Sequence, residues 1–346
     1  MTFFGSKKPI RVEVFAKTDL GRTRDHNEDR FLVADLTRKA HSLQPEVRHH
    51  TIGPRGTLLV VADGMGGAAA GELASEMATD TIYDHLVKTW NAEEEVTPQR
   101  FAYRLKEAVE AANASIHAHA KAHPEVRGMG TTTTAAGVLN DHLYLTQVGD
   151  SRAYLIRGGQ AHQITKDQSL MQRLVEAGEL TEEEAAQSER RNIILQALGP
   201  DPKVKVDLTH QEVRRGDVLV LCSDGLSGQV KKDEIGKIVT GTPDLSVACD
   251  KLIALANERG GPDNITVVVA RFDGDGLRFS GSGTEDDVGH QVYPLIDTET
   301  STEPVPVYKG SRPPVPNKET RQQTRMLVLA LIALAAALVW YFTRSQ

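Results

Sequence analysis

The chain has 346 residues, with 40 Lys and Arg against 47 Asp and Glu and a formal net charge of -7 at pH 7. A chain of this length can bury a core without disulfides. Its two cysteines, Cys222 and Cys249, have neither the number nor the spacing of a disulfide framework or a zinc site, which favours a reducing compartment. The acidic balance, without a Lys/Arg-rich block, argues against nucleic-acid binding.

The first residues, MTFFGSKKPI, contain no apolar stretch after a positive start, so we expect no secretory signal. Further along, apolar residues at helical spacing predict one helix from Leu73 to Leu86 and another from Phe101 to Ile116. Thr97 and Pro98 suit the N-cap and first position of the second helix. A third helix is expected over residues 245–257.

The strands are expected as hairpins rather than in alternation with helices, which indicates antiparallel sheets. Asn140-Asp141 and Gly158-Gly159 are tight-turn signals between apolar runs. The paired strands would be residues 132–139 with 142–148, and residues 151–157 with 160–165. The following segment, Asp167 to Gly199, is helix-rich and contains a capping-box pattern at Thr181 and Glu184.

Four aspartates stand in separate segments, each where an apolar β-like run ends or begins. They are Asp63 in LLVVADGMGG, Asp150 in QVGDSR, Asp224 in VLVLCSDG and Asp263 in DNITVVV, and a fifth segment, RDHNED at residues 24–29, adds more acid. Each string alone is weak, because Asp-Gly is common in turns. Gathered carboxylates would form a metal centre, and their hard oxygens favour Mg²⁺ or Mn²⁺ over zinc.

In this order, the five motifs resemble those of the metal-dependent Ser/Thr protein phosphatases of the type 2C class, over roughly residues 10–272. The resemblance implies an α+β fold, a four-layer α-β-β-α sandwich with two central antiparallel sheets, which agrees with the hairpins and helices above. Residues 1–9 would be an extension, and residues 167–199 resemble the family's flap subdomain. Arg190, Arg191 and Asn192 of the flap are candidate substrate contacts, although a structural role is equally open.

The resemblance also implies the site: two Mn²⁺ or Mg²⁺ ions whose bridging hydroxide attacks the phosphorus. Asp63 would lie between both ions, the Gly64 carbonyl would bind one, and Asp224 and Asp263 would complete the other. Asp150, with Asp224, resembles the site of a third, weaker ion, the alternative being a turn carboxylate. Glu28 and Asp29 would hold metal-bound waters, with a structural salt bridge as the alternative.

Arg24 corresponds to the family arginine that grips the phosphate, and a guanidinium fork suits phosphoryl oxygens. Arg22 is the competing neighbour, and either arginine could instead pair with nearby acids. Met65 departs from animal members, which have a histidine there that is proposed as general acid. The leaving-group proton would then come from metal-bound water or another side chain, such as His26.

Two further histidines, His119 and His123, stand four residues apart on a helix, but they lack a third ligand and are expected to be a solvated face. Residues 273–325 contain six prolines and few large apolar groups, which predicts a disordered linker. Residues 326–342 contain no charge, and a transmembrane helix is predicted over residues 326–343. More basic residues precede this span than follow it, so the preceding domain is expected to be cytoplasmic.

Together these features predict a bacterial-type Ser/Thr protein phosphatase, anchored in the inner membrane by a single span and opposing Ser/Thr protein kinases. Its expected partners are phosphoproteins and such a kinase. One alternative is a catalytically weak module that binds phosphoproteins, although the intact set of aspartates argues against it. Another is a phosphohydrolase acting on small phosphate esters or on a regulatory protein resembling an anti-sigma-factor antagonist.

Overall fold

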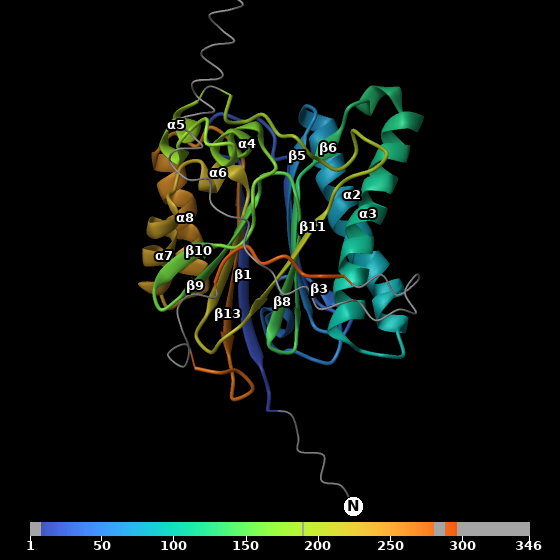
Figure 1. Cartoon of the computed structure of the whole chain (residues 1–346), viewed down its shortest axis with the longest axis vertical. Helices are drawn as coiled ribbons and strands as arrows, with labels where there is room; N and C mark the ends of the chain where they lie inside the picture. The colour runs from blue at the N-terminus through green and yellow to red at the C-terminus, as the bar shows by residue number, and fades with distance from the viewer. Residues whose placement is uncertain (1–7, 189, 280–287, 296–346) are drawn as a thin grey trace, which may run out of the picture. The chain divides into compact units, whose positions relative to one another are not determined.

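Two antiparallel β-sheets lie face to face at the centre of the computed structural model, which describes residues 8–188, 190–279 and 288–295 (Figure 1). The first sheet has the strand order β10-β9-β12-β13-β1-β4, and the second has the order β11-β8-β7-β5-β2-β3, with β6 beside β5. The first comprises β1 (Arg11–Asp19), β4 (His49–Thr51), β9 (Arg152–Arg157), β10 (Gln160–Gln163), β12 (Val218–Cys222) and β13 (Ile265–Asp273). The second comprises β2 (Asp29–Asp35), β3 (Ala40–His41), β5 (Thr57–Met65), β6 (Gly130–Thr131), β7 (Thr133–Leu139), β8 (His142–Val148) and β11 (Asp207–Glu212).

Two long helices cover the outer face of each sheet (Figure 1). Helices α2 (Ala68–Lys88) and α3 (Pro98–Ala122) pack on the second sheet, and α7 (Lys232–Thr240) and α8 (Leu245–Glu258) pack on the first. The shorter helices are α1 (Pro45–Arg48), α4 (Leu170–Glu176), α5 (Glu182–Gln187), α6 (Asp224–Ser227) and the 3-10 turns η1 (Trp90–Ala92) and η2 (Pro124–Val126). The predicted α-β-β-α sandwich is therefore confirmed.

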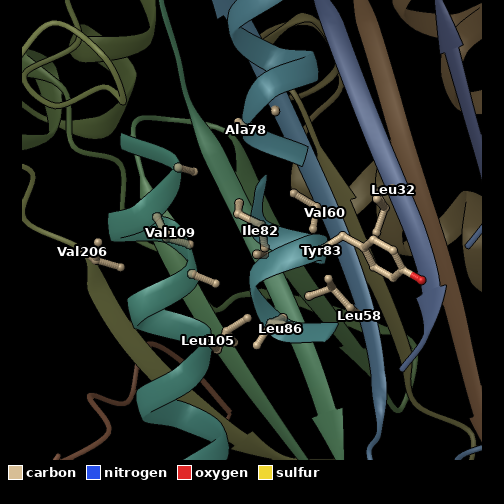
Figure 2. Close-up of a cluster of buried hydrophobic side chains, with 14 of the residues drawn as sticks. Leu32, Leu58, Val60, Ala78, Ile82, Tyr83, Leu86, Leu105, Val109 and Val206 are labelled. Atoms are coloured by element: carbon tan, nitrogen blue, oxygen red, sulfur yellow. The ribbon is translucent and has the colours of Figure 1, made fainter. Parts of the chain in front are cut away.

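Apolar side chains alternate between the two faces of a strand, and this alternation divides the core into layers. On β5, Leu58 and Val60 point toward α2, where they pack near Ile82 (Figure 2). Leu59 and Val61, on the opposite face of the same strand, pack between the two sheets. Successive side chains of a strand point to opposite faces, so a strand that is apolar throughout is buried on both sides.

The local signals in the sequence agree with the elements that form. The Thr97 side chain accepts a hydrogen bond from Arg100 N at the start of α3, and Thr181 and Glu184 form the predicted capping box of α5. Asn140, in the turn between β7 and β8, has a φ of 54°, in the left-handed region that asparagine tolerates. The three predicted helices and both predicted hairpins are confirmed.

Part of the predicted linker is ordered structure. Residues 288–295 run along the edge strand β11, where His210 N donates to Gln291 O (2.9 Å) and Tyr293 N donates to Leu208 O (3.0 Å). The Tyr293 ring also meets the Tyr144 ring edge to face, at 5.3 Å between centroids. The prediction of a disordered linker from residue 273 onward is therefore wrong for residues 288–295. The low-complexity sequence around Tyr293 gave no sign that its ring would pack against the domain.

The predicted transmembrane helix at residues 326–343 lies outside the described residues. Among the residues that are described, no helix is long and apolar enough to cross a membrane.

Candidate metal centre

Five carboxylates converge at one end of the sandwich because the strands that carry them begin or end there. Asp63 lies near the end of β5, and Asp29, at the start of β2, is its direct partner across the two strands. Asp224 follows β12 at the start of α6, while Asp263 precedes β13, the antiparallel neighbour of β12. Asp150 lies in the short connection between β8 and β9. The negative charges of the other four all act on Asp63, which shows that the predicted motifs meet in space.

The alternation of β5 explains why Asp63 points into this cluster. Leu59, Val61 and Asp63 are odd-numbered residues of one strand, and the first two face the space between the sheets. Asp63 continues that face at the point where the strand reaches the end of the sandwich. Asp29 and Asp150 are buried, at 3% and 7% exposure, whereas Asp63 remains partly accessible to solvent.

Burial and mutual repulsion hold protons on this cluster. Burial, together with the negative charges of Asp224 and Asp263, raises the pKa of Asp29 to about 7. Burial is also the main reason that the pKa of Asp150 rises to about 8 and that of Asp224 to about 6. The pKa of Asp63 lies well above its ordinary range for the same reason, with Asp29 the strongest of its charged neighbours. Cations bound here would replace these protons.

Unpartnered oxygen atoms test whether the cluster fits metal ions. One carboxylate oxygen, Oδ1, of each of Asp29, Asp150 and Asp224 is buried without a hydrogen-bond partner. Such atoms are costly to bury unless a ligand or water completes them. The donor set is all oxygen, which suits Mg²⁺ and Mn²⁺. The cluster therefore fits the predicted ions.

The protein supplies few ligands to any one position. Within the described ranges, no three His, Cys, Asp or Glu side chains are arranged to hold an ion by themselves. Mg²⁺ dehydrates reluctantly and keeps several waters when it binds to proteins.

Arg24 reaches the cluster from the loop between β1 and β2. Its Nη2 atom lies 2.7 Å from Asp263 Oδ2, and its side chain is about half exposed, at 49%. The hydrogen bond to Asp263 raises the pKa of the guanidinium, which stays charged. The neighbouring Arg22 is exposed and makes no ion pair within the described residues. Of the two arginines, the structure therefore brings Arg24 to the acids.

Two glycines allow the start of α2 to approach the cluster closely. A side chain at Gly64 would collide with the Gly71 carbonyl oxygen, and one at Gly71 would collide with the Glu28 carboxylate. Gly64 N also donates to Glu28 O at 3.2 Å. Glu28 thus lies against the strand end that carries Asp63, and burial raises its pKa.

The root of the predicted flap joins the connection that carries Asp150. Gln168 N donates to Gly149 O (2.8 Å), and Gly149 N donates to Gln168 Oε1 (3.0 Å). Asp167 forms an ion pair with Arg152, with an N to O distance of 2.6 Å. Arg190, Arg191 and Asn192 are exposed on the flap.

The candidate histidines contribute no further metal site in the described part of the chain. His119 and His123 stack on each other at the C-terminal end of α3, with 4.1 Å between their ring centroids. His26 is exposed on the Arg24 loop, and Met65 is partly buried at the end of β5.

Comparisons with known proteins agree with this geometry. Residues 44–257 match the family profile described as Protein phosphatase 2C. The chain belongs to the protein phosphatase 2C family. The serine/threonine phosphatase stp of Listeria innocua is 37% identical over 253 residues, which cover 73% of this chain and 93% of that protein. The serine/threonine protein phosphatase PstP of Mycobacterium tuberculosis is 42% identical over 213 residues, or 62% of this chain and 40% of that protein.

The solved structure of the PstP catalytic domain in complex with two manganese ions superposes with a TM-score of 0.62 at 37% identity. The match covers 76% of this chain and 99% of that domain. Family membership confirms the predicted enzyme class, a metal-dependent serine/threonine phosphatase that uses Mn²⁺ or Mg²⁺. The ligand assignments of individual residues remain predictions.

The sequence did not reveal the polar residues that hydrogen-bond to the acids and to the Arg24 loop. Ser223 Oγ donates to Asp29 Oδ2 at 2.7 Å, and Thr132 Oγ1 accepts from Asp63 N at 3.2 Å. Asn264 bonds to the loop that carries Arg24. Ser223 and Asn264 are direct neighbours of predicted ligands, which was the available signal, but nothing in the sequence identifies their partners.

Proposed function

We propose that this chain is a membrane-tethered protein phosphatase that hydrolyses phosphoserine and phosphothreonine and opposes Ser/Thr protein kinases. The observation that carries the catalytic part is the cluster of five carboxylates with three unpartnered buried oxygens, in which the half-exposed Arg24 pairs with Asp263. Family membership and the names of the relatives support the same reaction.

Asp63, the Gly64 carbonyl, Asp224 and Asp263 would hold the two ions, and Asp150 a third. When bound, the ions supply an activated water and neutralise negative charge on the phosphoryl group. Glu28 and Asp29 would orient water in the site, because both lie against the strand end that carries Asp63. The intact acid cluster disfavours a module that only binds phosphoproteins.

Arg24 would bind the phosphoryl oxygens. Its guanidinium pairs with Asp263 and is half exposed, so it is held at the edge of the cluster while it remains accessible to a substrate. Charge-assisted hydrogen bonds from arginine to phosphate are strong and can be bidentate. The contact would exist in the bound substrate and strengthen as charge develops in the transition state.

The leaving alkoxide needs a proton, and Met65 cannot provide one. A water molecule in the site or another side chain, such as His26 on the exposed loop, would provide it. The flap, rooted at Asp167 and Gln168 beside Asp150, would contact the phosphoprotein through Arg190, Arg191 and Asn192.

The membrane part of the proposal rests on the sequence. Residues 326–342 are uncharged and flanked by Arg325 and Arg344, and their length is at the short end for a single span. Basic residues are more numerous before the span, which favours a cytoplasmic catalytic domain at the inner membrane.

The test uses the purified full chain and three peptides that contain phosphothreonine, phosphoserine or phosphotyrosine. We expect release of phosphate from the first two with Mn²⁺ or Mg²⁺, and none with excess chelator. Full activity in chelator would contradict the metal mechanism. Hydrolysis of p-nitrophenyl phosphate without hydrolysis of any peptide would instead support the small-ester alternative.

A further inference from the structure

A single buried side chain clamps both ends of the loop that carries Arg24. Asn264 is 4% exposed, and its amide makes three hydrogen bonds to residues 20–28. Nδ2 donates to Leu20 O (3.0 Å) and to His26 O (2.9 Å), while Oδ1 accepts from Glu28 N (2.8 Å). We propose that Asn264 is a positioning residue that holds Arg24 in reach of the phosphoryl group. The inference rests on the proposed role of Arg24.

The hydrogen bonds that the loop makes near its own ends, from Gly21 N to Asp19 Oδ1 (2.9 Å) and from Asn27 Nδ2 to Thr18 Oγ1 (2.8 Å), leave the exposed part between them to be fixed by other contacts. The loop connects β1, which ends at Asp19, with β2, which begins at Asp29, and residues 22–26 are exposed. Such an exposed loop would sample many conformations unless contacts from elsewhere in the fold fix it. Besides the Asn264 bonds, Arg22 N donates to Gly261 O (2.7 Å). Both contacts attach the loop to the segment just before β13.

Only an amide satisfies all three loop contacts. Two of them need a donor and the third needs an acceptor, and a primary amide offers both from one planar group. An aspartate of the same shape would keep the acceptor but place a carboxylate oxygen against the carbonyls of Leu20 and His26. Because the residue is buried, the unsatisfied carbonyls would drive the loop away.

The clamp is separable from the adjacent predicted metal ligand. Asn264 holds Asp263 through its main chain, where Asn264 N donates to Asp263 Oδ1 at 2.8 Å. A change in the side chain leaves that bond intact. Substitution of the Asn264 side chain therefore leaves this main-chain donor in place, and Asp263 loses only the hydrogen bond from Arg24 that the displaced loop withdraws.

The test compares Asn264→Asp and Asn264→Ala with the wild-type full chain on a phosphothreonine peptide in Mn²⁺. We expect kcat/KM to fall by about 10- to 100-fold, and by no more than in Arg24→Ala, mainly through KM, because misplacement of a positioning group by about 1 Å has effects of up to that size. Calorimetric titration should still detect the two tightly bound Mn²⁺ ions. Loss of one of them would overturn the proposal, because Asn264 would then act through Asp263.

A double-mutant cycle with Arg24→Ala decides whether Asn264 acts through Arg24. In the Arg24→Ala background, Asn264→Asp should change kcat/KM by less than about twofold, since the group that it positions is gone. A full second loss of about 10- to 100-fold would overturn the inference and assign Asn264 a general structural role. Wild-type kinetics of Arg24→Ala alone would instead overturn the proposed role of Arg24.

Asn113→Asp provides a matched control. Asn113 is also buried, and its amide likewise clamps backbone, donating to Asp201 O (3.1 Å) and accepting from Gly199 N (2.8 Å). Its loop does not carry Arg24, but Gly199 ends the flap, so this control is read on p-nitrophenyl phosphate, which is too small to need the flap. On that substrate kcat/KM should stay within about twofold of wild type in Asn113→Asp and should fall in Asn264→Asp, although stability falls in both. An equal fall of kcat/KM in both variants would overturn the proposal.

Hydrogen exchange on the wild-type chain tests the clamp even if the variants do not fold. The Glu28 amide, which donates to the Asn264 side chain, should exchange as slowly as the neighbouring strand amides of β2. Rapid exchange of this amide would show that the clamp does not persist in solution and would overturn the inference.

Discussion

Because the acid cluster holds protons, we expect removal of divalent cations to lower the free energy of unfolding more at high pH than at low pH. In the metal-free protein, burial and mutual repulsion raise the pKa values of Asp29, Asp150 and Asp224 above the ordinary 3.8. The folded state therefore keeps protons that the unfolded chain has released. The stability linked to these protons is fully present below pH 3.8 and is lost as the pH rises through the raised values, up to about 8.

The pKa shift of Asp29 gives the size of this loss of stability. Its pKa rises from 3.8 to about 7, which corresponds to about 4 kcal/mol over the whole window. About 2 kcal/mol of this falls between about pH 5.5 and its pKa of about 7. The neighbouring carboxylates titrate in overlapping windows and increase the loss. Bound cations stabilise the charged carboxylates, so the loss should largely disappear when the site is loaded.

Urea unfolding, followed by circular dichroism at about pH 5.5 and pH 8, measures this directly. With EDTA, the free energy of unfolding should be at least about 2 kcal/mol lower at the higher pH, whereas saturating Mg²⁺ should remove most of that difference. Asn in place of Asp29 provides the control, because it still accepts the hydrogen bond from Ser223 but does not titrate. In EDTA, the fall in the free energy of unfolding between the lower and the higher pH should then be about 2 kcal/mol smaller in Asp29→Asn than in the wild type.

Two outcomes would refute this reasoning. If Asp29→Asn leaves the pH dependence of the metal-free protein unchanged, Asp29 does not hold a proton in the folded state. If Mg²⁺ leaves the drop unchanged, cations do not bind where these carboxylates meet.

Four further predictions concern catalysis and location. Asp63→Asn should lower turnover of a phosphothreonine peptide by at least about 100-fold, and wild-type turnover would refute its ligand assignment. Arg24→Ala should lower kcat/KM by about 10- to 100-fold while two ions still bind tightly; impairment of Arg22→Ala instead would transfer the role to Arg22. Asp150→Ala should keep two tight ions in a calorimetric titration, lose a weaker one and reduce turnover, whereas unchanged stoichiometry and activity would favour a turn carboxylate. The full chain should resist alkaline extraction from membranes, while a chain ending at Gly310 should be soluble and equally active on peptides. Protease added outside sealed cells should leave the catalytic domain intact, and its digestion would reverse the predicted orientation.

The sequence predicted most of the architecture because its signals are local. The turn at Asn140-Asp141 and the cap at Thr97 depend on a few neighbouring residues, and both form as predicted. Five short motifs also located the acids at strand ends. The part of the linker that pairs with β11 could not be predicted, because the signal is one aromatic, Tyr293, whose burial depends on a distant strand.

Residue types and their order by themselves determined the family and the hard-metal chemistry, and they predicted the acids that would supply the ligands. Only the tertiary structure decided which oxygens of these acids lack partners, because that depends on side chains more than a hundred residues apart. It also showed that Arg24, and not Arg22, pairs with Asp263, which favours the prediction that Arg24 binds the phosphate. The role of Asn264 is of the same kind: its amide is an ordinary polar group until folding places three backbone atoms of the Arg24 loop around it.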